Sequence, residues 1–308
     1  MAPEARLNAD PIGPAGAAGA AGPAGTGGHS GGAARESMEV VGERGRRLHV
    51  ERWAPVTVAS GTPKPPVVIV HGFGEHAGRY NHVAQALAGA GRATLAFDLA
   101  GHGRSDGRRA VVESVNDVVA DINRLVSAAT SPSKPVLLGH SMGGAFAAAY
   151  ATVNQGRLSA LVLSSPALHL AASPRWQALA VQALAAVAPR AGVTRIDPAG
   201  LSHDADVVTS FSSDPLVWHG RFPARTAVEL YRASRLAVDG AGELQLPTLI
   251  LHGDADPIVP VRSSPVFFAA LGSEDKELQI FPGLYHEPFN ELSKDAVIAV
   301  LLEWLSRH

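Results

Sequence analysis

Short apolar runs alternate along the chain with longer segments in which apolar residues recur every three or four positions. The runs at 65–72 (PPVVIVHG) and 134–141 (KPVLLGHS) are nearly continuous, which is typical of strands buried on both faces. The segments at 79–92 and 115–130 have helical periodicity. By the same criteria we expect strands at 48–55 (an edge strand), 93–103, 158–166, 246–256 and 276–283, and helices at 143–154 and 293–308. The alternation predicts an α/β fold with a mostly parallel central sheet and helices on both faces.

One interval interrupts this alternation. Roughly 80 residues separate the strand that ends near 166 from the strand that begins near 246, although a short crossover would be sufficient. We therefore expect a helical cap, or lid, at 166–246. It is inserted between two segments of the core, at 36–165 and 247–308.

The segment 176–189 (WQALAVQALAAVAP) within this cap is apolar on nearly every side, with Gln177 and Gln182 as exceptions. As a helix it is about 21 Å long, which is shorter than the roughly 30 Å hydrocarbon layer of a bilayer. It cannot cross a membrane. Two interpretations stay open: the helix lines a lipid-binding pocket or lies in a membrane interface, or it is simply buried within the cap.

The N-terminal residues 1–35 are mostly glycine, alanine and proline. Such a composition has few large apolar groups to offset the loss of backbone entropy, so we expect this tail to be disordered. The first residues have an acid and prolines where a secretory signal needs an apolar segment, and no apolar run reaches the length of a spanning helix. We expect a cytoplasmic location, with membrane association left open.

The overall composition excludes several classes of function. The formal net charge is −2 and both signs are scattered, so a nucleic-acid partner is not expected. The chain has no cysteine, which excludes disulfides, thiol catalysis and thiolate metal sites. Its 13 histidines show no metal-binding spacing such as H-E-x-x-H.

The pattern G-x-S-x-G occurs twice, around Ser30 (GGHSGG) and around Ser141 (LLGHSMGGAFA). This pattern indicates a nucleophilic serine only where a strand precedes it and a helix follows. Ser141 has that context, whereas Ser30 lies in the tail. Gly139 and Gly143 flank Ser141 at positions where side chains would collide across a tight turn. We therefore expect Ser141 to be the nucleophile and the copy around Ser30 to be accidental.

A serine nucleophile needs a base and an orienting acid, which follow it in this architecture in the order acid, then histidine. His286 lies in a loop after the strand at 276–283 and comes late enough in the chain to be the base. Asp254 and Asp256 both follow the strand at 246–256. The spacing slightly favours Asp256, because Asp254 directly follows a glycine and is placed to shape the turn. From the residues alone, both remain candidates.

An oxyanion hole needs two backbone N–H donors. One is expected from Met142, the residue after the nucleophile, and the other from the loop HGFGEH, where Phe73 is the natural candidate. His71 and His102 are expected to form hydrogen bonds within the scaffold, and His140 is expected to point the wrong way to be the base of Ser141.

Six segments occur in an order that resembles the bacterial monoacylglycerol lipases of the serine α/β-hydrolase fold. They are HGFGEHAGRY, DLAGHGRSDG, LLGHSMGG, SSDPLVWHG, LHGDADPIVP and FPGLYHEPFNE. The resemblance implies a catalytic triad of Ser141, Asp256 and His286, with Phe73 and Met142 as oxyanion donors. It also implies that Glu75 and Arg79 order the polar end of the pocket near the glycerol headgroup. Phe211 stands where many relatives have a tyrosine, which affects the expected selectivity for the alcohol group.

The implied activity is hydrolysis of monoacylglycerol to fatty acid and glycerol through an acyl-serine intermediate. It requires a small lipid ester as substrate and no metal or organic cofactor. A broader carboxylesterase or a lysophospholipase is the alternative enzyme, and a ligand-binding receptor on a hydrolase fold is the alternative outside enzymes. Peripheral membrane contact through the cap is left open, as is the oligomeric state.

Overall fold

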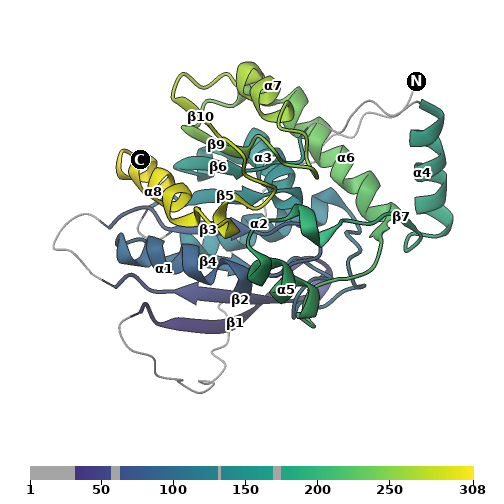
Figure 1. Ribbon diagram of the computed structural model, residues 1–308, viewed down its shortest axis with the longest axis horizontal. Coiled ribbons are helices and arrows are strands. Elements are labelled where there is room, and N and C mark those ends of the chain that lie inside the picture. Colours follow the sequence, from purple (N-terminus) through teal and green to yellow (C-terminus); the bar gives the residue numbers. More distant parts are fainter. Residues whose placement is uncertain (1–31, 57–62, 131–132, 169–174) are drawn as a thin grey trace.

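The computed structural model describes residues 32–56, 63–130, 133–168 and 175–308 (Figure 1). In helix α4, side chains are described from residue 179 onward. Ser30 and almost all of the predicted disordered tail at 1–35 therefore lie outside the described residues. Only 32–35 of that tail are described, and the first strand already begins at Arg35.

Eight strands of the described chain form one sheet, in the order β1-β2-β4-β3-β5-β6-β9-β10. Their bounds are β1 Arg35–Val41, β2 Arg47–Trp53, β3 Val67–Val70, β4 Thr94–Phe97, β5 Val136–His140, β6 Ala160–Ser164, β9 Thr248–Gly253 and β10 Lys276–Phe281. The six strands β4, β3, β5, β6, β9 and β10 run parallel, and β2 is antiparallel to both of its neighbours. The expectation that 48–55 is an edge strand is wrong, because β1 covers that side of β2.

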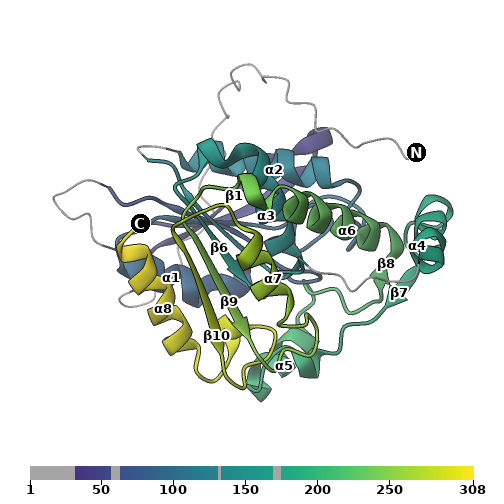
Figure 2. The same cartoon turned by 90° about the horizontal axis from the view of Figure 1, so that it is seen from above.

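Helices cover both faces of this sheet (Figures 1 and 2). α1 (Asn81–Gly89) and α8 (Lys294–Ser306) pack on one face, while α2 (Val115–Ala129), α3 (Met142–Asn154), α6 (Ala224–Asp239) and α7 (Ser263–Ala270) pack on the other. The central strands are buried along their whole length, as continuous apolar runs require in a doubly covered parallel sheet. This confirms the predicted fold class. Because these strands are parallel, the loops at their carboxyl ends meet along one rim.

The chain between β6 and β9 adds no strand to this sheet within its described part. It contains α4 (Arg175–Val187), β7 (Gly192–Thr194), α5 (Ala205–Ser213), β8 (Phe222–Pro223) and α6, and β7 and β8 form a separate antiparallel pair. α6 returns to the core and packs along α3, while α4 lies on α6 at the periphery (Figure 1). The cap bounds of 166–246 stay a prediction.

Helix α4 settles one question that its sequence left open. Leu179 is 64% exposed and Val187 is 83% exposed, while Ala185 packs against Ala224 and Val228 of α6. The described part of α4 is therefore a largely exposed apolar helix and not a buried one. Within the described ranges, no helix is long and apolar enough to span a bilayer.

Candidate active site

Ser141 lies in a sharp turn between β5 and α3. Its φ and ψ are 52° and −118°, a backbone conformation that non-glycine residues rarely adopt and that costs energy to hold. The surrounding hydrogen bonds maintain it: Ser141 N–H donates to the Ser164 carbonyl at 2.9 Å, and the Ser141 carbonyl accepts from Ala145 and Ala167. The serine is thereby lifted out of the strand and presented at the start of a helix.

Two glycines make this turn sterically feasible. A Cβ on Gly139 would lie 2.5 Å from the Gly143 carbonyl oxygen, and a Cβ on Gly143 would lie 2.3 Å from the carbonyl oxygens of Val70 and His71. Neither contact is tolerable, and in each case the obstacle is backbone. The collision that the G-x-S-x-G spacing predicts is therefore present on both sides of Ser141.

His286 lies between Ser141 and Asp256. Its Nε2 is 2.8 Å from Ser141 Oγ, and its Nδ1 is 2.7 Å from Asp256 Oδ2. The three residues come from the loops after β5, β9 and β10, and each is at most 9% exposed. With Nδ1–H donating to the carboxylate, Nε2 is left to accept the proton of the serine hydroxyl. The structure thus joins the three residues in one hydrogen-bonded line.

The two candidate aspartates have different surroundings. Asp256 Oδ1 accepts from the amides of Ile258 and Val259 at 2.8 and 2.9 Å, while Asp254 accepts from the Gly283 amide at an exposed turn. Burial by itself raises the pKa of Asp256, but hydrogen bonds from His252 and His286 outweigh it and hold the pKa well below its usual value. Asp256 is therefore ionised at neutral pH and faces His286, whereas Asp254 shapes the loop.

The neighbouring histidines are held within the scaffold, as expected. His71 donates from Nδ1 to the Gly72 carbonyl at 2.7 Å and accepts the Leu99 amide at Nε2. His140 Nδ1 lies 3.1 Å from the Ser164 carbonyl oxygen. Burial, assisted by repulsion from other histidines, lowers the pKa of His140 to about 4 and that of His102 to about 3. All three pKa values lie below the ordinary one, so these rings are neutral at pH 7.

The two expected oxyanion donors lie beside Ser141. Met142 is the first residue of α3, so its N–H has no acceptor within the helix. Phe73 follows Gly72, whose amide is fixed by donating to Glu75 Oε1 at 2.6 Å. Phe73, Met142 and Ser141 line the same cavity.

A buried ionic cluster adjoins the catalytic loop. The Arg79 guanidinium donates to Glu75 Oε2 at 2.7 Å and to both oxygens of Glu287, also at 2.7 Å. Tyr80 donates its hydroxyl to Glu75 Oε1, and the Phe211 ring lies 4.9 Å from the guanidinium carbon. Burial raises the pKa of Glu75, but Arg79 and nearby histidines bring it down to about 2. The cluster is thus a closed network with two carboxylates for one cation.

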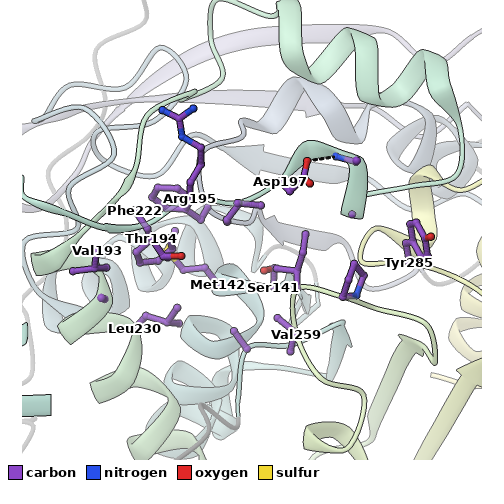
Figure 3. A pocket seen from close by; sticks show the side chains of 18 residues that line it. Ser141, Met142, Val193, Thr194, Arg195, Asp197, Phe222, Leu230, Val259 and Tyr285 are labelled. Carbon is purple, nitrogen blue, oxygen red and sulfur yellow. Dashed lines mark hydrogen bonds between the residues drawn. The ribbon is translucent and has the colours of Figure 1, made fainter. Parts of the chain in front are cut away.

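Two cavities of very different size adjoin Ser141. One has a volume of about 690 Å³ and is lined largely by apolar groups, among them Met142, Phe222, Leu230 and Val259 (Figure 3). The other has a volume of about 20 Å³, and Glu75, Glu287, Phe211 and His286 are among its lining residues. Arg79 does not line either cavity within the described chain; it lies behind the two carboxylates.

The loop that carries His286 is bonded to the segment inserted after β6. The amide of Glu287 donates to the Leu201 carbonyl at 2.8 Å, and that of His286 donates to the Gly200 carbonyl at 3.4 Å. Glu291, which is 1% exposed, accepts from the His203 ring and from the Tyr285 amide. The insertion therefore shares backbone and side-chain hydrogen bonds with the catalytic loop.

Sequence reasoning did not single out Glu287 or His252. Glu287 directly follows His286, but its partner Arg79 is 208 positions away in the chain. His252 lies inside the apolar run of β9, and that placement was a usable signal, because a buried polar side chain in a strand needs a partner.

Comparison with known proteins identifies the family to which this chain belongs. A family model described as "Serine aminopeptidase, S33" matches residues 61–293. A monoacylglycerol lipase of Mycolicibacterium smegmatis is 38% identical over 281 residues, covering 90% of this chain and 99% of the relative. The chain belongs to the monoacylglycerol lipase family.

Other members of the monoacylglycerol lipase family agree with this assignment. The monoglyceride lipase of Homo sapiens is 33% identical, over 87% of this chain and 89% of the relative. The crystal structure of the Paleococcus ferrophilus monoacylglycerol lipase superimposes with a TM-score of 0.75 at 31% identity, covering 85% of this chain and 99% of that chain. The resemblance seen in the sequence motifs and the α/β-hydrolase fold are both confirmed, and the chain is a carboxylic ester hydrolase.

Proposed function

We propose that this chain hydrolyses monoacylglycerols to a fatty acid and glycerol, with Ser141 as nucleophile, His286 as base and Asp256 as acid. The observation that carries the proposal is the hydrogen-bonded line from Ser141 to Asp256, with distances of 2.8 and 2.7 Å, at the edge of a large apolar cavity. The substrate class is supported by the relatives named monoacylglycerol lipase and monoglyceride lipase.

In the first half of the reaction, Ser141 Oγ attacks the ester carbonyl carbon while its proton passes to His286 Nε2. Asp256 stabilises the imidazolium that forms and keeps the ring in the required orientation. The amides of Phe73 and Met142 donate to the oxyanion of the tetrahedral intermediate. The intermediate collapses, and glycerol leaves with the proton from His286. Water then attacks the acyl-serine in the same way, releasing the fatty acid and regenerating Ser141.

The large cavity holds the acyl chain in this proposal. Its volume of about 690 Å³ lies within the range of roughly 300–1,000 Å³ that is usual for sites enclosing a small ligand. Because its wall is largely apolar, burial of a hydrocarbon chain there is favourable in proportion to the area removed from water.

The small cavity, which the carboxylates of Glu75 and Glu287 border, takes the alcohol group in this proposal. Glu75 and Glu287 present carboxylates that accept hydrogen bonds from glycerol hydroxyls, and Arg79 acts through these two carboxylates. The volume of about 20 Å³ holds roughly one water molecule. Glycerol therefore enters only when a wall of this cavity moves. Phe211, together with Phe73 and Ile196, also lines a neighbouring cavity of about 260 Å³.

The cap, expected at 166–246, supplies contact with the lipid surface from which the substrate comes. The exposed apolar side chains of α4, including Leu179 and Val187, support this role. Apolar groups on an interfacial helix favour peripheral binding at the boundary between headgroups and acyl chains. We propose a cytoplasmic enzyme that contacts membranes peripherally through α4.

The test compares the wild-type chain with Ser141→Ala on monoolein and with a fluorophosphonate probe. We expect Ser141→Ala to lose activity by a factor of roughly 10⁵–10⁶ and to lose labelling, because the nucleophile is removed. Ser30→Ala is the matched control, since it removes the serine of the other G-x-S-x-G copy, and its activity should equal that of the wild type.

A substrate series separates the proposal from its alternatives. Monoacylglycerols of increasing chain length are compared with a diacylglycerol, a lysophospholipid and a short p-nitrophenyl ester. Preference for monoacylglycerol supports the proposal, while equal turnover of all esters indicates a broader carboxylesterase. A folded wild-type chain that takes no probe and hydrolyses no ester would be a ligand-binding protein, and the proposal would be wrong.

A further inference from the structure

His252 is a buried histidine next to the triad that the mechanism above does not use. It is the penultimate residue of β9 and is fully buried. Its Nε2 lies 3.0 Å from Asp256 Oδ2 and 3.1 Å from the Val259 carbonyl oxygen, and its Nδ1 lies 2.7 Å from Ser264 Oγ at the start of α7. Every polar atom of the ring therefore has a partner.

These partners determine where the ring carries its proton. A carboxylate oxygen and a carbonyl oxygen can only accept, so Nε2 must be the N–H that donates to both. In the neutral ring, Nδ1 then accepts the hydrogen of the Ser264 hydroxyl. The tautomer that donates to Asp256 is thus fixed by the two acceptors at Nε2, and the Ser264 hydroxyl satisfies Nδ1 on the far side of the ring.

Asp256 Oδ2 consequently accepts hydrogen bonds from two imidazoles. His286 donates to it at 2.7 Å and His252 at 3.0 Å, while the amides of Ile258 and Val259 donate to Oδ1. A carboxylate offers about four lone-pair sites, and here four N–H donors use them. Any rotation of the carboxylate about its Cβ–Cγ bond weakens several of these bonds at once.

The two donor sets have different consequences for catalysis. The loop amides hold Oδ1 and belong to the same turn as Asp256, so they move with it. His252 lies on β9, in the sheet, and holds the oxygen that faces His286. It therefore ties the position of Oδ2 to the rigid core.

We propose that His252 is a positioning residue for ester hydrolysis, which fixes through Asp256 Oδ2 the direction in which the carboxylate meets His286. The proposal rests on the proposed function, in which Asp256 orients the base. His252 touches neither the substrate nor the reacting atoms. Its effect is expected on kcat, because the His286 orientation matters most when the imidazolium forms.

The test uses two substitutions of different chemistry in the full chain, with p-nitrophenyl butyrate as substrate. His252→Leu removes the donor and keeps an apolar group of similar bulk, while His252→Gln keeps an N–H donor. We expect kcat of His252→Leu to fall about 10- to 100-fold with KM within about 2-fold, since a hydrogen bond to a charged group is lost. His252→Gln should recover to within about 3-fold of the wild-type kcat, because its amide replaces the Nε2 donor.

A spectroscopic readout separates positioning from mere stability. An imidazole N–H that donates to a buried carboxylate gives a low-field proton resonance. Two such protons, from His286 and His252, are expected at Asp256, in addition to those of other pairs such as His49 and Glu51. In His252→Leu one resonance disappears and the His286 resonance shifts. In His252→Gln the His286 resonance stays near its wild-type position. This readout needs no substrate, so it measures the contact whether or not the ester is hydrolysed.

His49→Leu is the matched control. His49 donates from Nε2 to the buried carboxylate of Glu51 at 2.8 Å, but it lies on β2, separated from β9 by β4, β3, β5 and β6. The His49→Leu variant lacks an equivalent imidazole–carboxylate bond far from Asp256. Its kcat should stay within about 2-fold of wild type, and both low-field protons at Asp256 should remain.

Ser264→Ala gives a second route if His252→Leu does not fold. It keeps the imidazole but removes the hydroxyl that holds Nδ1 in place, and we expect kcat to fall by roughly 2- to 5-fold with a shifted His286 resonance. The proposal is overturned if the folded variants keep the wild-type kcat and His286 resonance, or if His252→Gln is as impaired as His252→Leu. A wild-type chain without ester hydrolysis or fluorophosphonate labelling would instead contradict the proposed function.

Discussion

The two cavities that meet at Ser141 differ in size, lining and freedom to adapt. The larger, of about 690 Å³, is bounded by side chains such as Leu230 and Val259 that make only non-directional contacts. The smaller, of about 20 Å³, is bounded by Glu75 and Glu287. Arg79 donates to one oxygen of Glu75 and to both oxygens of Glu287, and the other oxygen of Glu75 accepts from Gly72 and Tyr80. An apolar wall adjusts to ligands of different length, whereas a closed ionic network resists change because each movement leaves a charge unpaired. We infer that the enzyme is tolerant on the acyl side and restrictive on the alcohol side.

The largest expected effect comes from removing the cation of the polar side. Arg79→Met leaves Glu75 and Glu287 without their shared partner in a buried site, so we expect a loss of about 3–5 kcal/mol in the free energy of unfolding at pH 7. The loss should depend on pH. In the wild type the pKa of Glu75 is about 2, below its ordinary value of 4.5, so its contribution is present above pH 4.5 and disappears as the pH falls towards 2.

In Arg79→Met, burial acts on Glu75 without the opposing cation and raises its pKa, so this variant is expected to recover stability as the pH falls. Urea denaturation between pH 7 and pH 3 should therefore show the gap between the two proteins narrowing. Arg52→Met is the control, because Arg52 pairs with Glu36 on the exposed surface and its loss should cost at most about 1 kcal/mol. Equal losses in both variants would show that the buried cluster has no special role.

The second effect tests the adaptable side. Leu230→Trp places a larger side chain in the acyl cavity. We expect kcat/KM for long-chain monoacylglycerols to fall about 10- to 100-fold, while kcat/KM for short esters is nearly unchanged. Tyr231→Trp, at the adjacent and exposed position of α6, is the control and should leave the chain-length profile unchanged. A uniform loss over all chain lengths would argue against an acyl-binding role for this cavity.

The smallest expected effect concerns Phe211, which lines the 20 Å³ cavity. Phe211 covers the Arg79 guanidinium and, with Phe73 and Ile196, forms a wall shared by the 20 Å³ cavity and the neighbouring cavity of about 260 Å³. Phe211→Ala removes that wall, and we expect the ratio of diacylglycerol to monoacylglycerol turnover to rise about 3- to 10-fold. Phe211→Tyr keeps the wall, so a change in this ratio in that variant measures the effect of the added hydroxyl and not of the wall. If Phe211→Ala leaves the ratio unchanged, the polar side is not what restricts the alcohol group.

Much of the sheet was predictable because its central strands are continuous apolar runs. β3, β5 and β9 are buried along their whole length, so their sequences contain no competing signal. β1 was missed because six of its seven residues are exposed, and only its pairing with β2 holds it in the sheet.

The candidate site divides in a similar way. The turn at Ser141 is local: its glycines, strand and helix all lie between Val136 and Asn154, so the sequence pattern captures it. The choice between Asp254 and Asp256 is not local, because it depends on which carboxylate faces a loop 30 positions further along the chain. The partners of Glu287 and His252 are determined only in the folded chain. The hydropathy pattern indicates that His252 needs a partner, but it does not identify Asp256 as that partner.

The bonds between Leu201 and Glu287 and between His203 and Glu291 bear on how the molecule can be shortened. These hydrogen bonds show that residues 200–203 hold in place the loop that carries His286. A truncated variant that lacks all residues between β6 and β9 would lose more than a cover over the active site. It would also lose the hydrogen bonds that hold the loop carrying His286 in position. Any redesign of the lid must therefore retain this short stretch, however freely the outer helix is exchanged.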